Sequence, residues 1–140
     1  MNSNPQAAHP KLLVVEDDPD DRLFIRSALY SVCSKEVQVR FAGSGIDLMD
    51  YLRSLGGEHL PALIVLDLNL PRFDGRTILR ELKGDLAFSA IPVVILSTSM
   101  AEEDVRFCLQ HGADAYYPKP NSPKDLETVF NSLCSKYEIQ

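Results

Sequence analysis

The sequence predicts an α/β protein in which helices cover both faces of a doubly wound, five-stranded parallel sheet. Strand-sized apolar runs and helix-sized amphipathic segments alternate five times along the 140 residues. The runs at 12–15 and 63–66 are apolar at every position, which is typical of parallel strands buried on both faces. Because each run is followed by a helical segment, right-handed crossovers should join neighbouring parallel strands.

Five segments have the length and the Val, Ile, Leu and Tyr content of strands. They are residues 11–16, 37–41, 62–67, 91–96 and 114–117. We expect the strand order 2-1-3-4-5, in which the first and third strands flank the point where the order reverses. In such sheets the ligand crevice lies outside the carboxyl ends of the strands at that point.

Each predicted helix begins with a capping signal. The signals are Asp18-Pro19, Ser44 with Asp47, Asp74, Ser99 with Glu102, and Ser122-Pro123. In such signals a side-chain oxygen accepts a backbone N–H of the first turn, and proline suits the first helical position. Residues 1–10 lack periodicity and should form a loose tail, which leaves 11–140 as one domain.

Composition and charge exclude several classes of function. The formal net charge is −6 and no basic run occurs, so we expect no nucleic-acid partner. No apolar stretch is long enough for a membrane span and residues 1–5 lack signal-peptide features, so the protein should be cytoplasmic. Cys33, Cys108 and Cys134 are odd in number and widely spaced, which predicts reduced structural thiols.

Acidic side chains close two of the apolar runs. Glu16 and Asp17 follow the first strand, and Asp67 ends the third. Because these strand ends meet at the predicted crevice, the three carboxylates should converge. Like charges about 4 Å apart repel by roughly 4 kcal/mol at an effective dielectric constant near 20, so such a cluster needs a cation. Mg²⁺ takes oxygen ligands, often including phosphate oxygens, so the cluster predicts a magnesium site for phosphate chemistry.

Two further polar residues follow neighbouring strands, Ser97 after the fourth and Lys119 after the fifth. With these residues in place, the chain resembles the receiver domain of two-component response regulators over residues 11–136. The resemblance is carried by Leu-Val-Val-Glu-Asp-Asp-Pro at 13–19, Leu-Asp-Leu-Asn-Leu-Pro at 66–71, Asp74-Gly75, Ser97 and Lys119-Pro120. It implies a flavodoxin-like fold of five βα units, in agreement with the expected sheet.

The resemblance implies a nucleophile and a metal site. Asp67 would be the phosphoacceptor, attacking a phosphohistidine to form an aspartyl phosphate, a covalent role open to carboxylates. Asp17 and Asp67 would bind Mg²⁺ directly, Glu16 would bind it mainly through water, and Asn69 would add its backbone carbonyl. Self-phosphotransfer and autodephosphorylation would be the only reactions, so the chain is not expected to be an enzyme.

The resemblance also implies roles around the transferred phosphoryl group. Lys119 would neutralise one phosphoryl oxygen, and the Ser97 hydroxyl would donate to another after transfer. In a loose transition state, positioning and charge neutralisation are most of the catalysis. Tyr116 either packs in the core or acts as a switch residue that turns inward when Ser97 closes on the phosphate. The Lys119–Pro120 bond is implied to be cis.

The implied partners are other signalling proteins. A sensor histidine kinase would supply the phosphoryl group, and the segment 67–76 looks most like the small regulators that serve phytochrome-type kinases. A histidine phosphotransfer protein or a second copy in a homodimer could also bind. The chain ends about one turn after the fifth predicted helix, so we expect the signal to pass by docking.

Three other interpretations compete. A Mg²⁺-dependent aspartyl phosphatase of the haloacid dehalogenase type also uses a strand-end Asp, but it needs a second acid where this chain has Asn69. A flavodoxin-like flavin binder has a first loop rich in Ser, Thr and Gly, whereas residues 16–19 are acidic and would repel phosphate without a metal. A receiver-like interaction module could also act without phosphorylation, although the acid, hydroxyl and lysine set argues against this.

Overall fold

The computed structural model describes residues 10–33, 38–68 and 74–139, and within them the predicted βα alternation is found. The strands are β1 (Leu12–Val15), β2 (Val39–Ala42), β3 (Leu63–Asp67), β4 (Val93–Ser97) and β5 (Ala115–Pro118). The helices are α1 (Pro19–Val32), α2 (Gly45–Ser54), α3 (Gly75–Gly84), α4 (Glu102–Gln110) and α5 (Pro123–Lys136), with a short 3-10 turn at Gly57–His59 that was not predicted.

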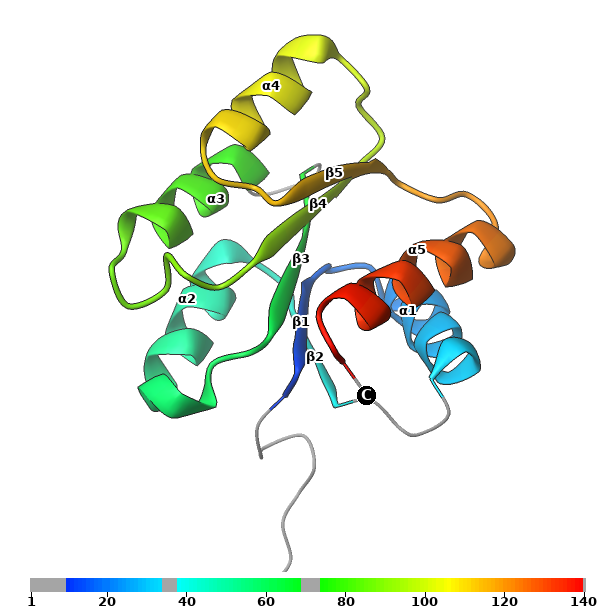
Figure 1. Ribbon diagram of the computed structural model, residues 1–140, viewed down its shortest axis with the longest axis horizontal. Helices are drawn as coiled ribbons and strands as arrows, with labels where there is room; N and C mark the ends of the chain where they lie inside the picture. Colours follow the sequence, from blue (N-terminus) through cyan, green and yellow to red (C-terminus); the bar gives the residue numbers. More distant parts are fainter. Residues whose placement is uncertain (1–9, 34–37, 69–73, 140) are drawn as a thin grey trace, which may run out of the picture.

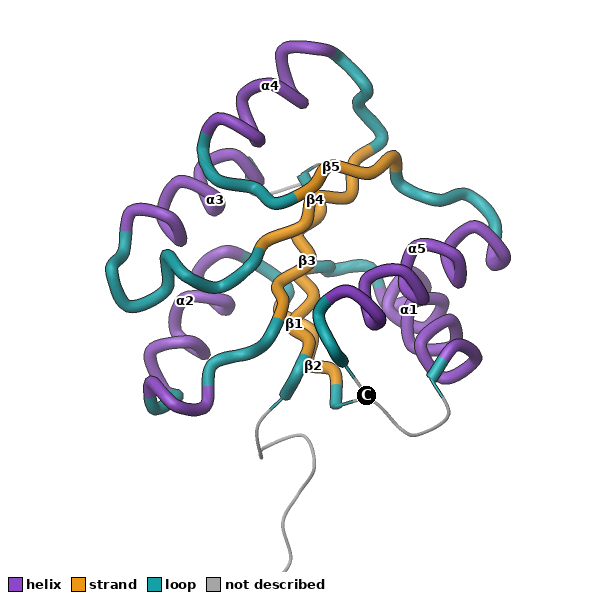
Figure 2. The backbone as a smooth tube through the Cα atoms, in the orientation of Figure 1, coloured by secondary structure: helices purple, strands orange, loops and turns teal. Residues whose placement is uncertain are grey.

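The strands form one parallel sheet in the order β2-β1-β3-β4-β5, which confirms the predicted topology. Helices α1 and α5 cover one face, and α2, α3 and α4 cover the other (Figure 1). Figure 2 shows the strands as a central layer between these two sets of helices. No helix of the described chain combines the length and the apolar character that crossing a membrane requires.

Alternate residues of the central strands enter two separate cores, because successive side chains of a strand point to opposite faces. In β1, Leu13 and Val15 pack with α2 and α3, whereas Leu12 and Val14 pack with α1 and α5. Strands β1, β3 and β4 are buried at every position, which the apolar runs 12–15 and 63–66 predicted for β1 and β3. The parallel pairing of β1 with β3, in which Val15 lies opposite Leu66, places the carboxyl ends of the two strands next to each other.

The predicted N-caps of α1, α2, α3 and α5 are confirmed. Asp18, Ser44, Asp74 and Ser122 each accept a backbone N–H from the first turn. The predicted capping box at Ser99 is wrong, because α4 begins after Ala101, which has no capping side chain. The Ser99 hydroxyl instead donates to Asp104 Oδ2 at 2.6 Å. A hydrogen bond between two side chains therefore takes the place of the predicted bond to the helix backbone.

The loop after β3 returns close to the strand at Gly75. A Cβ atom on Gly75 would lie 2.7 Å from Leu68 Cα, so no larger residue fits without a shift of the backbone. The Gly75 N–H also donates to the Leu68 carbonyl at 3.4 Å. This contact fixes the start of α3 beside the end of β3. Asn69 and the rest of 69–73 lie outside the described residues, as do residues 1–9 of the predicted tail.

Candidate functional site

Three side chains from the carboxyl ends of three strands meet at one point. Lys119 Nζ lies 2.7 Å from Asp67 Oδ2 and 3.2 Å from Glu16 Oε1. Both carboxylates are buried, with Asp67 6% exposed and Glu16 3% exposed. The structure therefore places a buried acid pair and one cation where the sequence predicted a crevice.

Lys119 reaches this point because of how β5 ends. Strand β5 is an edge strand, and its last residue, Pro118, lies opposite Ser97 of β4. A proline is tolerated there because an edge strand needs hydrogen bonds on one side only. The next backbone N–H, that of Lys119, donates to the Ser97 carbonyl at 2.8 Å. No peptide bond among the described residues is cis, so the cis bond implied before Pro120 is not found.

Asp21 is a site residue that the sequence analysis missed. Its Oδ2 lies 3.2 Å from Lys119 Nζ, so the ammonium group contacts three carboxylates. The available signal was the acidic first turn of α1, which holds Asp20 and Asp21 after the Asp18 cap. Because acids are favoured at a helix N-terminus, the helix start alone was enough to explain why acidic residues occur there. Asp21 differs from Asp20 in its contact with Lys119, and the position of that lysine, far along the chain, is not visible in the local sequence.

Burial and charge act against each other in this cluster. Burial raises the pKa of Glu16 above its ordinary value, and the charge of Asp67 adds to the rise, while the Asp18 N–H and Lys119 act in the opposite direction. For Lys119, burial works against the charged form, but the hydrogen bond and charge of Asp67 and the charge of Glu16 raise its pKa. The lysine is therefore held as a cation.

The predicted convergence of Glu16, Asp17 and Asp67 is found only in part. Asp17 is exposed, and within the described residues no group of three or more acidic, histidine or cysteine side chains is arranged to hold a metal ion. Within this part of the chain, the Lys119 ammonium group lies between the two buried carboxylates, 3.2 Å from Glu16 and 2.7 Å from Asp67. The donors themselves, carboxylates at the ends of adjoining strands, are the kind that Mg²⁺ binds.

An apolar cavity adjoins the charged cluster. Its volume is about 430 Å³, and Glu16, Asp67 and Lys119 form part of its wall. The cavity continues between α1 and α5, where Phe24 and Leu126 line it. The low-polarity surroundings explain why burial is the largest influence on both the Glu16 and the Lys119 pKa.

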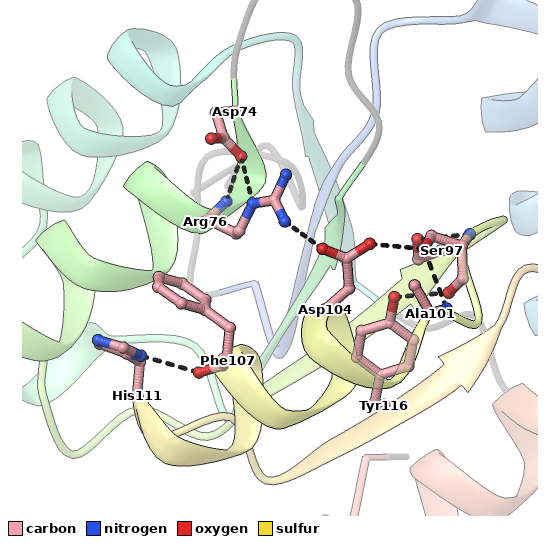
Figure 3. Close-up of polar contacts among 9 residues, drawn as sticks. Asp74, Arg76, Ser97, Ala101, Asp104, Phe107, His111 and Tyr116 are labelled. Carbon is pink, nitrogen blue, oxygen red and sulfur yellow. Dashed lines mark hydrogen bonds and ion pairs between the residues drawn. The ribbon is translucent and has the colours of Figure 1, made fainter.

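The hydroxyl at the end of β4 belongs to a second polar network. Ser97 is fully buried, and its Oγ accepts the Ser99 N–H at 3.0 Å. The Tyr116 hydroxyl donates to the Ser99 carbonyl at 2.6 Å, so the loop after β4 is held from two sides (Figure 3). The Tyr116 ring also packs against the core on the α2–α4 side of the sheet. Tyr116 therefore has both a packing contact and a hydrogen bond to the loop beside Ser97, and its role as a switch residue stays a prediction.

This network extends from the loop to two helices. Arg76, near the start of α3, pairs with Asp74 and with Asp104 of α4 (Figure 3). Asp104 in turn accepts the Ser99 hydroxyl. The loop that carries Ser99 is thus connected to both α3 and α4. No local pattern in the sequence predicts these contacts, because they depend on how two separate helices pack.

The sequence also matches known proteins. The family profile described as response regulator receiver domain matches residues 12–131. The chain is 32% identical to the response regulator Rre1 of Synechocystis sp. over 127 residues, which are 91% of this chain and 52% of Rre1, so it spans about half the length of that relative. It is 35% identical to the response regulator Rcp1 of the same organism over 128 residues, which are 89% of this chain and 84% of Rcp1.

Solved structures of such relatives have the same fold. The phosphorylated cyanobacterial phytochrome response regulator RcpA superposes with a TM-score of 0.81 at 35% identity, over 94% of this chain and 95% of RcpA. The Mn²⁺-bound form of Rcp1 superposes with a TM-score of 0.75 at 32% identity, over 90% of this chain and 93% of Rcp1.

Proposed function

The chain belongs to the response regulator receiver domain family, and on this basis we propose that it is a cytoplasmic phosphorylation switch whose phosphoacceptor is Asp67. A sensor histidine kinase donates the phosphoryl group, and the modified chain signals by contact with another protein. The reaction modifies the chain itself, so the protein is not an enzyme with a separate substrate. We assign the receiver domain to residues 11–140.

The contact between Lys119 and Asp67 is the observation that carries this proposal. An incoming phosphoryl group brings oxygens with negative charge to a carboxylate that is itself negative. Lys119 lies 2.7 Å from the carboxylate and its raised pKa keeps it positive, so it offsets this repulsion. For a loose transition state such fixed charge is the main contribution that a protein can make.

A divalent cation belongs to the proposed reaction. The residues that would hold it are Glu16, Asp17 and Asp67, together with the Asn69 backbone carbonyl. The similar protein Rcp1 has been solved in a Mn²⁺-bound form, which supports a divalent cation in the reaction. Such a cation supplies positive charge to the phosphoryl oxygens. Mg²⁺ is the ion we propose, because it suits carboxylate and phosphate oxygens and keeps several waters.

The network at the end of β4 is the proposed output. Ser97 turns its hydroxyl to the phosphoryl group and gives up the Ser99 N–H that it now accepts at 3.0 Å. The loop then moves relative to Tyr116, whose hydroxyl holds the Ser99 carbonyl. Because Asp104 joins the same loop to α4, the change reaches the surface formed by α4, β5 and α5.

The α4–β5–α5 surface and the similar proteins suggest which partner proteins this chain binds. RcpA, which is 35% identical, is a phytochrome response regulator, and we propose a phytochrome-type sensor kinase as the donor for this chain. A histidine phosphotransfer protein or a second copy of the chain could receive the signal at the α4–β5–α5 surface.

A phosphotransfer assay tests the proposal. Purified phosphorylated histidine kinases, phytochrome-type and others, are mixed with the chain and Mg²⁺, and transfer is followed by loss of label from the kinase. We expect rapid transfer from a phytochrome-type kinase and none to Asp67→Asn. Transfer from other kinases alone would contradict the phytochrome assignment. Absence of transfer from every donor would favour a module that acts by contact without phosphorylation.

A further inference from the structure

Two cysteines that are far apart in the sequence lie side by side in the fold. Cys33 Sγ and Cys134 Sγ are 3.6 Å apart, although 101 positions separate the two residues. Cys33 directly follows the last residue of α1, and Cys134 lies in the last turns of α5. All three cysteines of the chain are free thiols here. Their wide spacing in the sequence predicted separate structural thiols and did not indicate this pair.

The packing of α1 against α5 fixes the position of the pair. The two helices lie next to each other on the same face of the sheet (Figure 1). Both cysteines belong to the core on this face, where Leu29 and Leu133 are buried. The backbone N–H of Cys33 is held by the Leu29 carbonyl at 3.0 Å, so the residue keeps its place at the helix end. The two thiols therefore face each other in the folded chain.

We propose that Cys33 and Cys134 form a reversible intramolecular disulfide when the chain meets an oxidised low-molecular-weight thiol such as glutathione disulfide. A disulfide needs the sulfur atoms at about 2.05 Å, so the two thiols must close the present contact of 3.6 Å. The reaction takes place away from Asp67 and Lys119. It adds a modification site that phosphorylation does not use.

The electrons and protons balance in two exchange steps. The Cys33 sulfur, as thiolate, attacks one sulfur of glutathione disulfide and releases the first glutathione. The Cys134 sulfur then attacks the Cys33 sulfur of this mixed disulfide and releases the second glutathione. The two protons of the protein thiols end on the two glutathione thiols. The protein loses two electrons and glutathione disulfide gains them.

Accessibility sets the order of these steps. Cys33 is partly exposed, whereas Cys134 is buried. Burial, with the hydrogen bond from Cys33, raises the pKa of Cys134 to about 12, so Cys134 is a poor first nucleophile. Once Cys33 carries glutathione, the adjacent Cys134 reacts as an intramolecular partner. Cys108 is fully buried in the core on the opposite face of the sheet and takes no part.

The disulfide would connect the C-terminal ends of two helices that also line the cavity beside Lys119. A cross-link over so long a loop restricts the unfolded chain strongly. We therefore expect the oxidised protein to unfold at a temperature several degrees higher than the reduced protein. The increase should disappear on treatment with dithiothreitol.

The test uses the full chain incubated with glutathione disulfide and then alkylated. Thiol titration should show that two of the three cysteines are lost, and mass spectrometry should find a peptide pair joined through Cys33 and Cys134. Cys108→Ser should behave like the wild type in forming this link, whereas Cys33→Ser should not form it. Cys33 is partly exposed, so this variant keeps the test valid even if Cys134→Ser does not fold.

Three results would overturn the proposal. A link that includes Cys108, a link only between two chains, or a mixed disulfide with glutathione that never resolves would each exclude the Cys33–Cys134 pair. None of these results depends on Asp67, so the phosphorylation assay and the thiol assay fail or succeed independently.

Discussion

Lys119 Nζ lies 2.7 Å from Asp67 Oδ2, although 52 positions separate the two residues in the sequence. The contact joins the ends of β3 and β5 above a buried acid, Glu16. In the proposed reaction Lys119 has two roles, because the charge that stabilises the resting carboxylates would also stabilise the incoming phosphoryl group.

Lys119→Ala should destabilise the metal-free protein by about 1–3 kcal/mol, because it leaves buried carboxylates without their cation. Mg²⁺ should recover more stability in this variant than in the wild type, since the ion replaces the missing charge. Urea unfolding with EDTA and with Mg²⁺ measures both effects. Lys124→Ala, at an exposed position of α5, is the matched control. Equal losses in the two variants would exclude a stabilising role for the Lys119 cluster.

Glu16→Gln should make the metal-free protein more stable at neutral pH. The folded-state pKa of Glu16 is raised, chiefly by burial, so the unfolded chain loses this proton at a lower pH than the folded chain does. The unfolding free energy of the wild type therefore falls as pH rises through this range, and a neutral glutamine removes the fall.

Urea unfolding in EDTA at pH ~4 and ~7 measures whether Glu16→Gln raises or lowers the unfolding free energy at each pH. The gain from Glu16→Gln should be present at the higher pH and small at the lower one. Glu58→Gln, at an exposed position, serves as the control. A Glu16→Gln variant less stable than wild type at neutral pH would show that the negative charge at Glu16 stabilises the resting fold.

Tyr116→Phe should destabilise the protein by about 1 kcal/mol, because it removes a hydroxyl that donates to the Ser99 carbonyl at 2.6 Å. The ring remains to pack, so the fold should persist. Hydrogen exchange should become faster in the loop between β4 and α4. Tyr117→Phe is the control, since its hydroxyl donates no hydrogen bond that the structure records among the described residues. If both variants behave alike, the Tyr116 hydroxyl does not hold this loop.

Gly75→Ala should cost about 1–3 kcal/mol, because the added Cβ would lie 2.7 Å from the Leu68 backbone. Gly84→Ala offers a comparison within the same helix, since nothing lies within 4 Å of a Cβ at that position. We expect that change to be neutral or slightly stabilising. Thermal unfolding of the two variants compares them directly, and a Gly75→Ala protein as stable as Gly84→Ala would show that the loop after β3 adjusts freely.

Much of the fold could be predicted because its signals are local. Apolar runs marked the strands, and Asp18, Ser44, Asp74 and Ser122 marked helix starts within one turn of where they occur. The predicted strand bounds differ slightly from those observed. For example, the fourth strand was predicted at 91–96 and spans Val93–Ser97. The start of α4 was missed because Ser99 binds the Asp104 carboxylate, which a capping pattern does not reveal.

The site could be predicted in its location and only partly in its contacts. Strand ends determine where Glu16, Asp67 and Lys119 lie, and strand ends are visible in the sequence. Asp21 was missed because its contact depends on the reach of a lysine from another element. The pairing of Arg76 with Asp104 depends on the packing of α3 against α4, which no local pattern encodes.

Phosphorylation of Asp67 is the central claim, and a small phosphodonor tests it most directly. The chain is incubated with acetyl phosphate and Mg²⁺, and peptide mass spectrometry locates the phosphoryl group. We predict one alkali-labile aspartyl phosphate on Asp67 that is absent with EDTA and absent in Asp67→Asn, while Asp50→Asn, at an exposed position of α2, remains labelled. An unlabelled wild type, or an Asp67→Asn variant labelled as strongly as the wild type, would contradict the account.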